Sequence, residues 1–327
     1  MSRRGWALFL ALGVIWGIPY LLIKIAIDDL SPATLVFART GLSTLLLLPV
    51  AMARDQLRPL VAHWRPLLVY TVVEICLPWV LLGRAEQELS SSLTGLLVAA
   101  VPLVGAALVK FTGHETLGAR RVVGLLVGFA GVAALVGFDV GSSSAVAVAA
   151  VGLVAICYAL GPLILARHLA HLPSMGVVAA SLAITFVIYA PIGVLQWPDQ
   201  APGTDTWLSV VGLAVVCTAV AFLVFFALIA EVGPARATVI TYVNPAVALV
   251  LGVIVLDERV TVATGIGFAL ILLGSVLATQ REAPAPVPER EPLPVGASGP
   301  PGAPGGLGAP GDEVMTDDVA ACPVAEP

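Results

Sequence analysis

Charged residues are scarce in this sequence. Only 11% of its 327 residues are Asp, Glu, Lys or Arg, whereas 59% are hydrophobic. Soluble domains carry roughly 25% charged and about 45–50% apolar residues, so this composition excludes a water-soluble globular protein. It indicates a chain that lies within a lipid bilayer.

The sequence also lacks the residue patterns of common catalytic and metal sites. It has four cysteines, and their spacing matches neither a disulfide framework nor a paired-cysteine metal site. No nucleotide-binding loop, HExxH motif or nucleophile elbow is present. We therefore expect no metal, no cofactor and no enzymatic activity, and no nucleic-acid partner.

Most of the negative charge belongs to the C-terminal tail. Residues 281–327 carry two basic and eight acidic side chains, whereas the rest of the chain carries 14 basic and 13 acidic ones. The tail is rich in Pro, Gly and Ala, so it cannot bury enough apolar surface to offset the entropy of ordering. We predict a disordered extension, and a segment that binds a partner is the less favoured interpretation.

Apolar runs long enough to cross a bilayer follow one another along the rest of the chain. A membrane-spanning helix needs about 20 apolar residues, and continuous apolar runs favour helices over the alternating strands of a barrel. This pattern predicts ten spans, with approximate bounds Trp6–Ile27, Ala33–Ala53, Pro66–Gly83, Leu93–Phe111, Val122–Phe138, Ala145–Ala166, Ser174–Trp197, Trp207–Ala230, Ala235–Leu256 and Val262–Thr279.

These spans form a gapless duplication. Adding 143 to a residue number leads from the first copy to the second, so that Glu115 pairs with Glu258, and other pairs are Pro19 with Pro162, Pro102 with Pro245, Gly124 with Gly267 and Gly131 with Gly274. A repeat of this length indicates two copies of one structural unit. We predict one five-span unit in residues 1–138 and another in residues 139–280.

Basic residues cluster at alternate joints between the spans. Because such joints stay in the cytoplasm, both termini are predicted to be cytoplasmic, in a multi-pass membrane protein. Units of five spans then face opposite ways, and the second unit should lack basic residues where the first unit has them. The first-unit residues are Arg3, Arg4, Arg54, Arg58, Arg65, Lys110, Arg120 and Arg121, and none of their equivalents 143 positions later is basic. We predict an all-α polytopic protein of two inverted repeats, which is an architecture typical of secondary transporters.

The repeated motif resembles a known family. Each copy has an apolar helix with a proline, an acidic residue in a short joint and a glycine-spaced helix, as in PLVGAALVKFTGHETLGARRVVGLLVGFAGV and PAVALVLGVIVLDERVTVATGIGFALILLGSVL. This is similar to the EamA domain of the drug/metabolite transporter superfamily, over nearly all of residues 6–279. The resemblance implies an inner-membrane carrier that exports metabolites, amino acids or drug-like compounds. It implies no particular substrate, because members with very different cargoes share the motif.

Three charged residues within predicted spans are candidates for the transport pathway. Glu74 lies roughly 13 Å from Arg65 along the helix, near the middle of the bilayer. A carboxylate facing lipid there costs roughly 3 kcal/mol, so we expect Glu74 to face a cavity and carry a proton, or to be a neutral acid bonded to a neighbouring helix. Arg39 and Lys24 either contact substrate or snorkel to the interface, and snorkelling is the favoured interpretation for Lys24.

Prolines and polar residues near the predicted centre complete the candidate site. Interruptions at equivalent places in both halves point to a central site, although kinks for packing are an alternative. The helix-break candidates are Pro19, Pro102, Pro162 and Pro245, and the nearby side chains able to stack on or bond a ligand are Trp16, Tyr20, Tyr158, Tyr242 and Asn244. Glu115 and Glu258 lie in joints at the membrane surface, so we interpret them as structural residues that cap helix ends.

The leading hypothesis is a secondary carrier for a small molecule, coupled to a gradient of protons or of a counter-substrate. A membrane scaffold or sensor without transport, a lipid translocator and a membrane-embedded enzyme are the alternatives. The substrate, the direction of transport and the oligomeric state do not follow from the sequence.

Compartment-sensitive reporters test the predicted topology. Reporters fused after Arg4 and after Arg290 should both read as cytoplasmic, and one inserted near Asp205 should read as external, because positively charged joints stay inside. Termini that read on opposite sides would rule out the inverted repeat.

Overall fold

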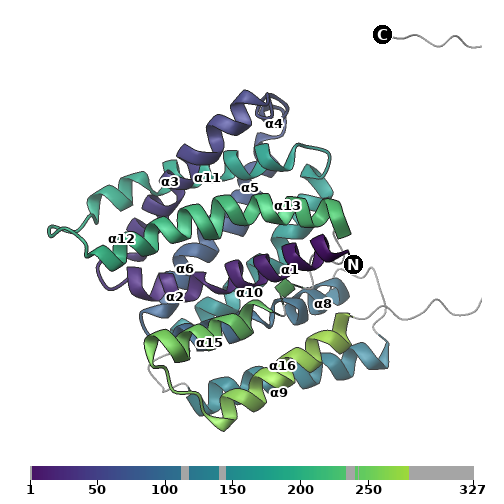
Figure 1. Cartoon of the computed structure of the whole chain (residues 1–327). Helices are drawn as coiled ribbons and strands as arrows, with labels where there is room; N and C mark the ends of the chain where they lie inside the picture. The colour runs from purple at the N-terminus through teal and green to yellow at the C-terminus, as the bar shows by residue number, and fades with distance from the viewer. Residues whose placement is uncertain (1, 112–117, 140–144, 233–239, 242, 280–327) are drawn as a thin grey trace, which may run out of the picture. The chain divides into compact units, whose positions relative to one another are not determined.

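The protein is helical throughout the part of the chain that is described (Figure 1). The computed structural model describes residues 2–111, 118–139, 145–232, 240–241 and 243–279. Nine helical segments in these ranges are long and apolar enough to cross a membrane. Their bounds differ by at most three residues from those of nine predicted spans. The remaining predicted span, Ala235–Leu256, is described as a helix from Asn244 to Leu256.

The first half of the chain contains α1 (Arg3–Gly17), α2 (Pro19–Ala26), α3 (Pro32–Ala53), α4 (Arg58–Val61), α5 (Trp64–Thr71), a π-helical segment (Val72–Cys76), α6 (Leu77–Glu86), α7 (Ser91–Val98), α8 (Val101–Phe111) and α9 (Ala119–Asp139). The second half contains α10 (Ala145–Ile164), a π-helical segment (Leu165–Leu169), α11 (Ser174–Leu195), α12 (Thr204–Val211), a π-helical segment (Gly212–Val220), α13 (Ala221–Val232), α15 (Asn244–Leu256) and α16 (Val262–Thr279). The predicted tail, residues 281–327, lies outside the described residues.

Several helices begin where the sequence supplies a serine cap. The side chains of Ser2, Ser31 and Ser90 accept hydrogen bonds from backbone N–H groups in the first turns of α1, α3 and α7, respectively. Such caps satisfy donors that have no partner within the helix.

Three of the four predicted break prolines lie in the first turn of a helix. Pro19 is the first residue of α2, and Pro102 and Pro245 are the second residues of α8 and α15. Proline fits this position because the first N–H groups of a helix have no intrahelical acceptor.

The helix does not break at Pro162, contrary to the prediction. Helix α10 runs through Pro162 to Ile164 and continues directly into the π-helical segment Leu165–Leu169. One missing hydrogen bond does not end a helix whose flanks are packed, and α10 lies against α6 and the segment Val72–Cys76.

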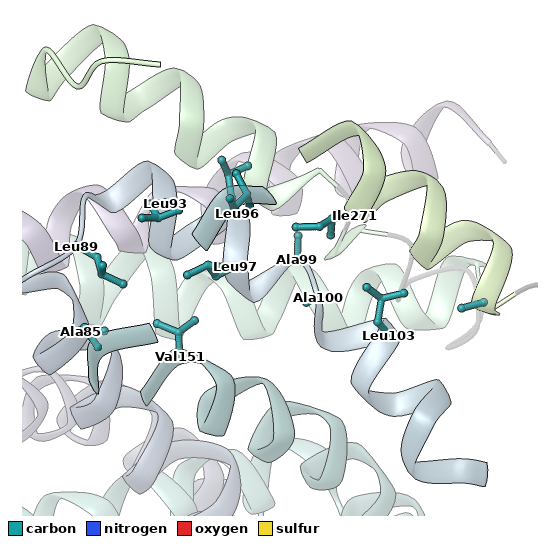
Figure 2. Close-up of a cluster of buried hydrophobic side chains, with 13 residues drawn as sticks. Ala85, Leu89, Leu93, Leu96, Leu97, Ala99, Ala100, Leu103, Val151 and Ile271 are labelled. Atoms are coloured by element: carbon teal, nitrogen blue, oxygen red, sulfur yellow. The ribbon is translucent and has the colours of Figure 1, made fainter. Parts of the chain in front are cut away.

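Helices α7 and α8 meet inside an apolar core, which Figure 2 shows in close-up. Ala99 and Ala100 lie at the junction, next to Leu96 of α7, and Val151 of α10 and Ile271 of α16 belong to the same cluster. The N–H groups of Ala99 and Ala100 donate to carbonyls one turn earlier in α7. The junction therefore leaves none of its own N–H groups unpaired in an apolar environment.

Glycines allow close contact between α9 and α16, which lie side by side (Figure 1). A Cβ atom added at Gly131 would lie 2.7 Å from the carbonyl oxygen of Gly267 and 2.8 Å from the backbone nitrogen of Ile271. A Cβ atom added at Gly267 would lie 2.7 Å from the side chain of Leu135. These two glycines lie on opposite helices, so the backbones approach each other directly, as in other small-residue interfaces in membranes.

A single methyl group should therefore separate these two helices. Gly131→Ala is expected to lower the melting temperature of the detergent-solubilised protein, because the new Cβ meets backbone atoms that cannot rotate away. Gly137→Ala is the control on the same helix, since no atom lies within 4 Å of a Cβ built there. Equal melting temperatures for the two variants would contradict the close contact.

Candidate functional site

Two long helices contain π-helical segments at equivalent positions. The segment Val72–Cys76 contains Glu74, and adding 143 leads to Cys217 within the segment Gly212–Val220. A π-helical turn widens the helix by one residue and often occurs at functional sites. These segments could not be predicted from the sequence, because no residue type specifies them.

Glu74 lies in the middle of its span, which runs from Trp64 to Glu86. Its Oε2 atom is buried and has no hydrogen-bond partner in the part of the chain that is described. Gly161 of α10 lies directly against this carboxyl group, and a Cβ atom at Gly161 would collide with Oε2. The carboxyl group of Glu74 therefore occupies space that is open only because residue 161 is a glycine.

Arg39 of α3 is buried, with 7% of its surface exposed. Its Nε atom donates a hydrogen bond of 3.1 Å to Oγ1 of Thr218, and its Cζ atom lies 3.6 Å from the ring centroid of Trp79. A guanidinium over an indole ring is stabilised by the negative face of the ring. Arg39 forms no ion pair within 4.0 Å with any described carboxylate. Contrary to the alternative of snorkelling, the side chain is held inside the bundle.

Hydroxyl groups hold Arg39 in this position. Thr218 donates a hydrogen bond of 2.7 Å to the carbonyl oxygen of Leu213, five residues earlier, as the π-helical geometry permits. Ser43 of α3 lies within 2.8 Å of the carbonyl oxygen of Arg39 and 3.1 Å of that of Ala214. These contacts fix α3 against the π-helical segment Gly212–Val220.

Tyr158 of α10 joins the two charged residues. Its hydroxyl group lies close to Trp79, and Tyr158 interacts electrostatically with both Glu74 and Arg39. Arg39, Glu74, Trp79, Tyr158 and Thr218 are referred to below as the central polar cluster. Trp79 and Thr218 were not among the predicted site residues, although Thr218 follows Cys217, the repeat equivalent of Glu74.

Two other predicted residues, Trp16 and Tyr20, are not members of the central polar cluster, although Tyr158 packs against the apolar cluster that contains Tyr20. Trp16 lies against Phe225 at a centroid distance of 5.0 Å. Tyr20 is buried in a cluster with Val154 and Ala248. Tyr242 lies outside the described residues.

Asn244 holds helix ends together. In the orientation that satisfies its surroundings, its amide nitrogen donates to the carbonyl oxygens of Gly13 at 3.2 Å and Ile240 at 3.1 Å. Asn244 therefore links α1 to the start of α15.

The hydrogen bonds of Lys24 lie away from the central polar cluster. Its Nζ atom donates to the carbonyl oxygen of Glu86 and, at 3.0 Å, to that of Leu89. These carbonyls lie at and just beyond the C-terminus of α6, where a cation is favoured by the helix dipole.

Acidic residues from one predicted unit cap helices of the other. The two carboxylate oxygens of Glu258 accept hydrogen bonds from the backbone N–H groups of Ser91, at 2.7 Å, and Ser92, at 2.9 Å. Glu258 therefore caps α7 of the first unit and not the helix that follows it in sequence. Its repeat equivalent, Glu115, lies outside the described residues.

Asp29 makes a similar contact with the start of α12. Its Oδ2 atom accepts from Oγ1 of Thr206 at 2.6 Å and from the N–H of Gly203 at 2.7 Å. These hydrogen bonds, that of Thr206 above all, lower the pKa of the exposed Asp29 carboxyl group. The contact is therefore present at neutral pH and is lost only as acid protonates the group.

Two pockets are lined by described residues, and the first of them includes the capping residue Glu258. One, of about 380 Å³, is lined by Lys24, Ile25, Asp28, Glu88, Leu89, Ser90, Leu256 and Glu258. The other, of about 580 Å³, lies between α3, α6 and α11 and includes Arg84 and Tyr189. We call the end of the bundle that carries the first pocket the acidic end. Among the described residues, no three His, Cys, Asp or Glu side chains are grouped to hold a metal ion.

Comparisons with known proteins identify a family, two relatives and a fold. The sequence matches the EamA-like transporter family over residues 3–137 and 145–280. It is 28% identical over 276 residues to the uncharacterized transporter YvbV of Bacillus subtilis (strain 168), covering 81% of this chain and 88% of that protein. It is 28% identical over 281 residues to the uncharacterized inner membrane transporter YedA of Escherichia coli (strain K12), covering 84% of this chain and 89% of that protein. One crystal structure has the same fold, with a TM-score of 0.61 at 21% identity, and the match covers 85% of this chain and 97% of that chain.

The contact between Gly161 and Glu74 is testable without knowledge of a substrate. Gly161→Ala should force the carboxyl group off α10, and Glu74 should then react severalfold faster with a membrane-permeant carbodiimide, as measured by peptide mass spectrometry. The melting temperature should change little, because the displaced atoms are the end of a flexible side chain. Gly152→Ala, on the same helix with no atom within 4 Å of the new Cβ, is the control and should react as the wild type does.

Proposed function

Because this chain belongs to the EamA-like transporter family, we propose that it is a secondary active carrier that exports a small metabolite, amino acid or drug-like compound. The protein is a multi-pass membrane protein, and the helical spans and the matches to transporters support this general assignment. The proposed location is the cell inner membrane with both termini in the cytoplasm, which places the acidic end outside.

The proposed architecture is ten spans in two inverted units, residues 1–138 and 139–280, followed by a disordered tail. The helix contacts support it. Under the 143-residue shift α3 corresponds to α11 and α9 to α16, and each packs against its own equivalent. The contact of α1 with α13 corresponds in the same way to the contact of α10 with α6. This exchange of contacts is expected from a two-fold axis that relates the units.

The central polar cluster is the proposed substrate and coupling site. Its elements come from both units, so rocking one unit against the other would expose it to each side in turn. Arg39 bonds described residues through Nε alone, which leaves its terminal amino groups for an acidic or electron-rich group of the substrate. Glu74, with an unpartnered oxygen, is the proposed proton carrier. These two groups in the middle of the bundle are the observation that carries the proposal.

The substrate is best sought without assuming its class. An untargeted comparison of the metabolites that cells secrete with and without the protein should reveal one compound whose release depends on it. If the secreted metabolites do not change but a labelled lipid moves across the bilayer, a lipid translocator would be favoured. If neither the secreted metabolites change nor the labelled lipid moves, a scaffold or sensor would be favoured.

Glu74→Gln tests the coupling step. Glutamine keeps the size and the hydrogen-bonding capacity of the side chain but cannot ionise, so uptake into proteoliposomes driven by a pH gradient should fall by about a hundredfold. Counterflow of labelled substrate should survive in part, because exchange between two substrate pools need not move a net proton.

The exposed Glu88 provides a matched control on the same connected stretch of chain. Glu88→Gln should leave both gradient-driven uptake and counterflow near wild-type rates. Wild-type gradient-driven rates in Glu74→Gln would remove Glu74 as the coupling group, while the carrier assignment would still rest on the family and the helix contacts.

A further inference from the structure

Glu86 is a second buried carboxyl group on the span that contains Glu74. It is the last residue of α6 and has no exposed surface. Neither of its carboxylate oxygens has a hydrogen-bond partner in the described ranges of the chain. Lys24 is close, but its Nζ atom donates to the backbone carbonyl of Glu86 and not to the carboxyl group.

An ionised carboxylate is costly in this environment. Burial removes it from water, and the described residues supply no donor that replaces the lost hydrogen bonds. The protonated acid avoids this cost, so the observed arrangement favours a carboxyl group that holds a proton.

The groups that face Glu86 act in opposite directions. Lys24 and Tyr20 face it from α2, and Glu258 faces it from the joint between α15 and α16. The positive charge of Lys24 favours ionisation, whereas the negative charge of Glu258 opposes it. A movement of α2 relative to that joint would therefore change whether Glu86 keeps its proton.

Glu86 also lies between water and the centre of the bundle. Lys24 and Glu258, its charged neighbours, line the pocket of about 380 Å³ at the acidic end. On the inner side, Tyr20 interacts electrostatically with both Glu86 and Tyr158, and Tyr158 interacts with Glu74. Along the helix, Glu86 is roughly 18 Å from Glu74, at 1.5 Å per residue. The two tyrosines lie in one buried cluster with Leu82 of α6.

From this geometry we infer that Glu86 is a second proton-binding site, which exchanges protons between the pocket at the acidic end and Glu74. The inference rests on the proposed proton coupling. A proton from water in the pocket binds the Glu86 carboxylate. When the units move and bring the hydroxyl groups of Tyr20 and Tyr158 within hydrogen-bond distance of the two carboxyl groups, the proton is passed to the Glu74 carboxylate through Tyr20 and then Tyr158. Each tyrosine accepts one proton as it donates another and so ends unchanged. Glu86 is left ionised until it takes a new proton from the pocket, and transfer in the opposite direction follows the same steps in reverse.

Infrared difference spectroscopy tests the site without a substrate. In the reconstituted full-length protein, the carbonyl stretch of a protonated carboxylic acid should include a component that disappears as pH rises and that is absent from Glu86→Gln. Glu88→Gln, which changes an exposed carboxyl group of the same pocket, should keep that component. A titrating component that is unchanged in Glu86→Gln, or a Glu86 component that never titrates, would overturn the proposal.

Transport rates then separate this inference from the proposed function. Glu86→Gln and Tyr20→Phe should each slow uptake driven by a pH gradient by about tenfold or more, with counterflow retained. If neither variant slows it while Glu74→Gln abolishes it, the relay is wrong and the coupling by Glu74 stands. If the wild type shows no gradient-driven uptake, the proposed coupling fails and the relay with it, whatever the spectra show.

A second variant covers the case in which Glu86→Gln does not fold. Glu86→Asp keeps the carboxyl group and shortens the side chain by one methylene, so it should keep a titrating infrared component at a shifted frequency. An Asp variant without any such component would contradict a proton site at this position.

Discussion

A bilayer interior offers no water to backbone N–H and C=O groups, so every helix end inside or near it must be satisfied by the protein. In this chain, residues from other elements satisfy the ends of several spans. Glu258 holds the start of α7, Asp29 holds the start of α12, and Lys24 holds the carbonyls at the end of α6. Charged residues at the acidic end therefore act first as caps that join distant segments of the chain.

The same constraint shapes the centre of the bundle. A π-helical turn displaces backbone carbonyls from their usual donors, and Thr218 bonds one of them, that of Leu213. The same hydroxyl group accepts a hydrogen bond from Arg39. The residue that satisfies a backbone carbonyl of the π-helical segment therefore also positions a buried cation. Glu74 lies in the equivalent segment of the other unit, where its second oxygen remains unpaired. Irregular backbone and unpaired charge thus occur together, as expected where a membrane protein binds polar ligands.

The two units share a shape but not a chemistry. Arg39, Glu74 and Glu86 belong to the first unit, and their equivalents in the second are Leu182, Cys217 and Ile229. Leu182 and Cys217 are buried apolar residues that pack against neighbouring helices. The two copies therefore have matched helix contacts, while only one copy carries the charged groups of the proposed site.

The sequence by itself determined the bounds of nine described spans to within three residues, because hydrophobic length is a local property that composition records directly. It also identified Glu74 and Arg39, since a charge within an apolar run is costly wherever the chain folds. Only the tertiary structure decided which side chains and backbone groups contact these residues. Several features depend on groups distant in sequence: the contacts of Trp79 and Thr218, the capping role of Lys24, the choice of α7 as the helix that Glu258 caps, and the unbroken helix at Pro162. No local pattern encodes them, because each is the outcome of where another helix end or another side chain lies in space.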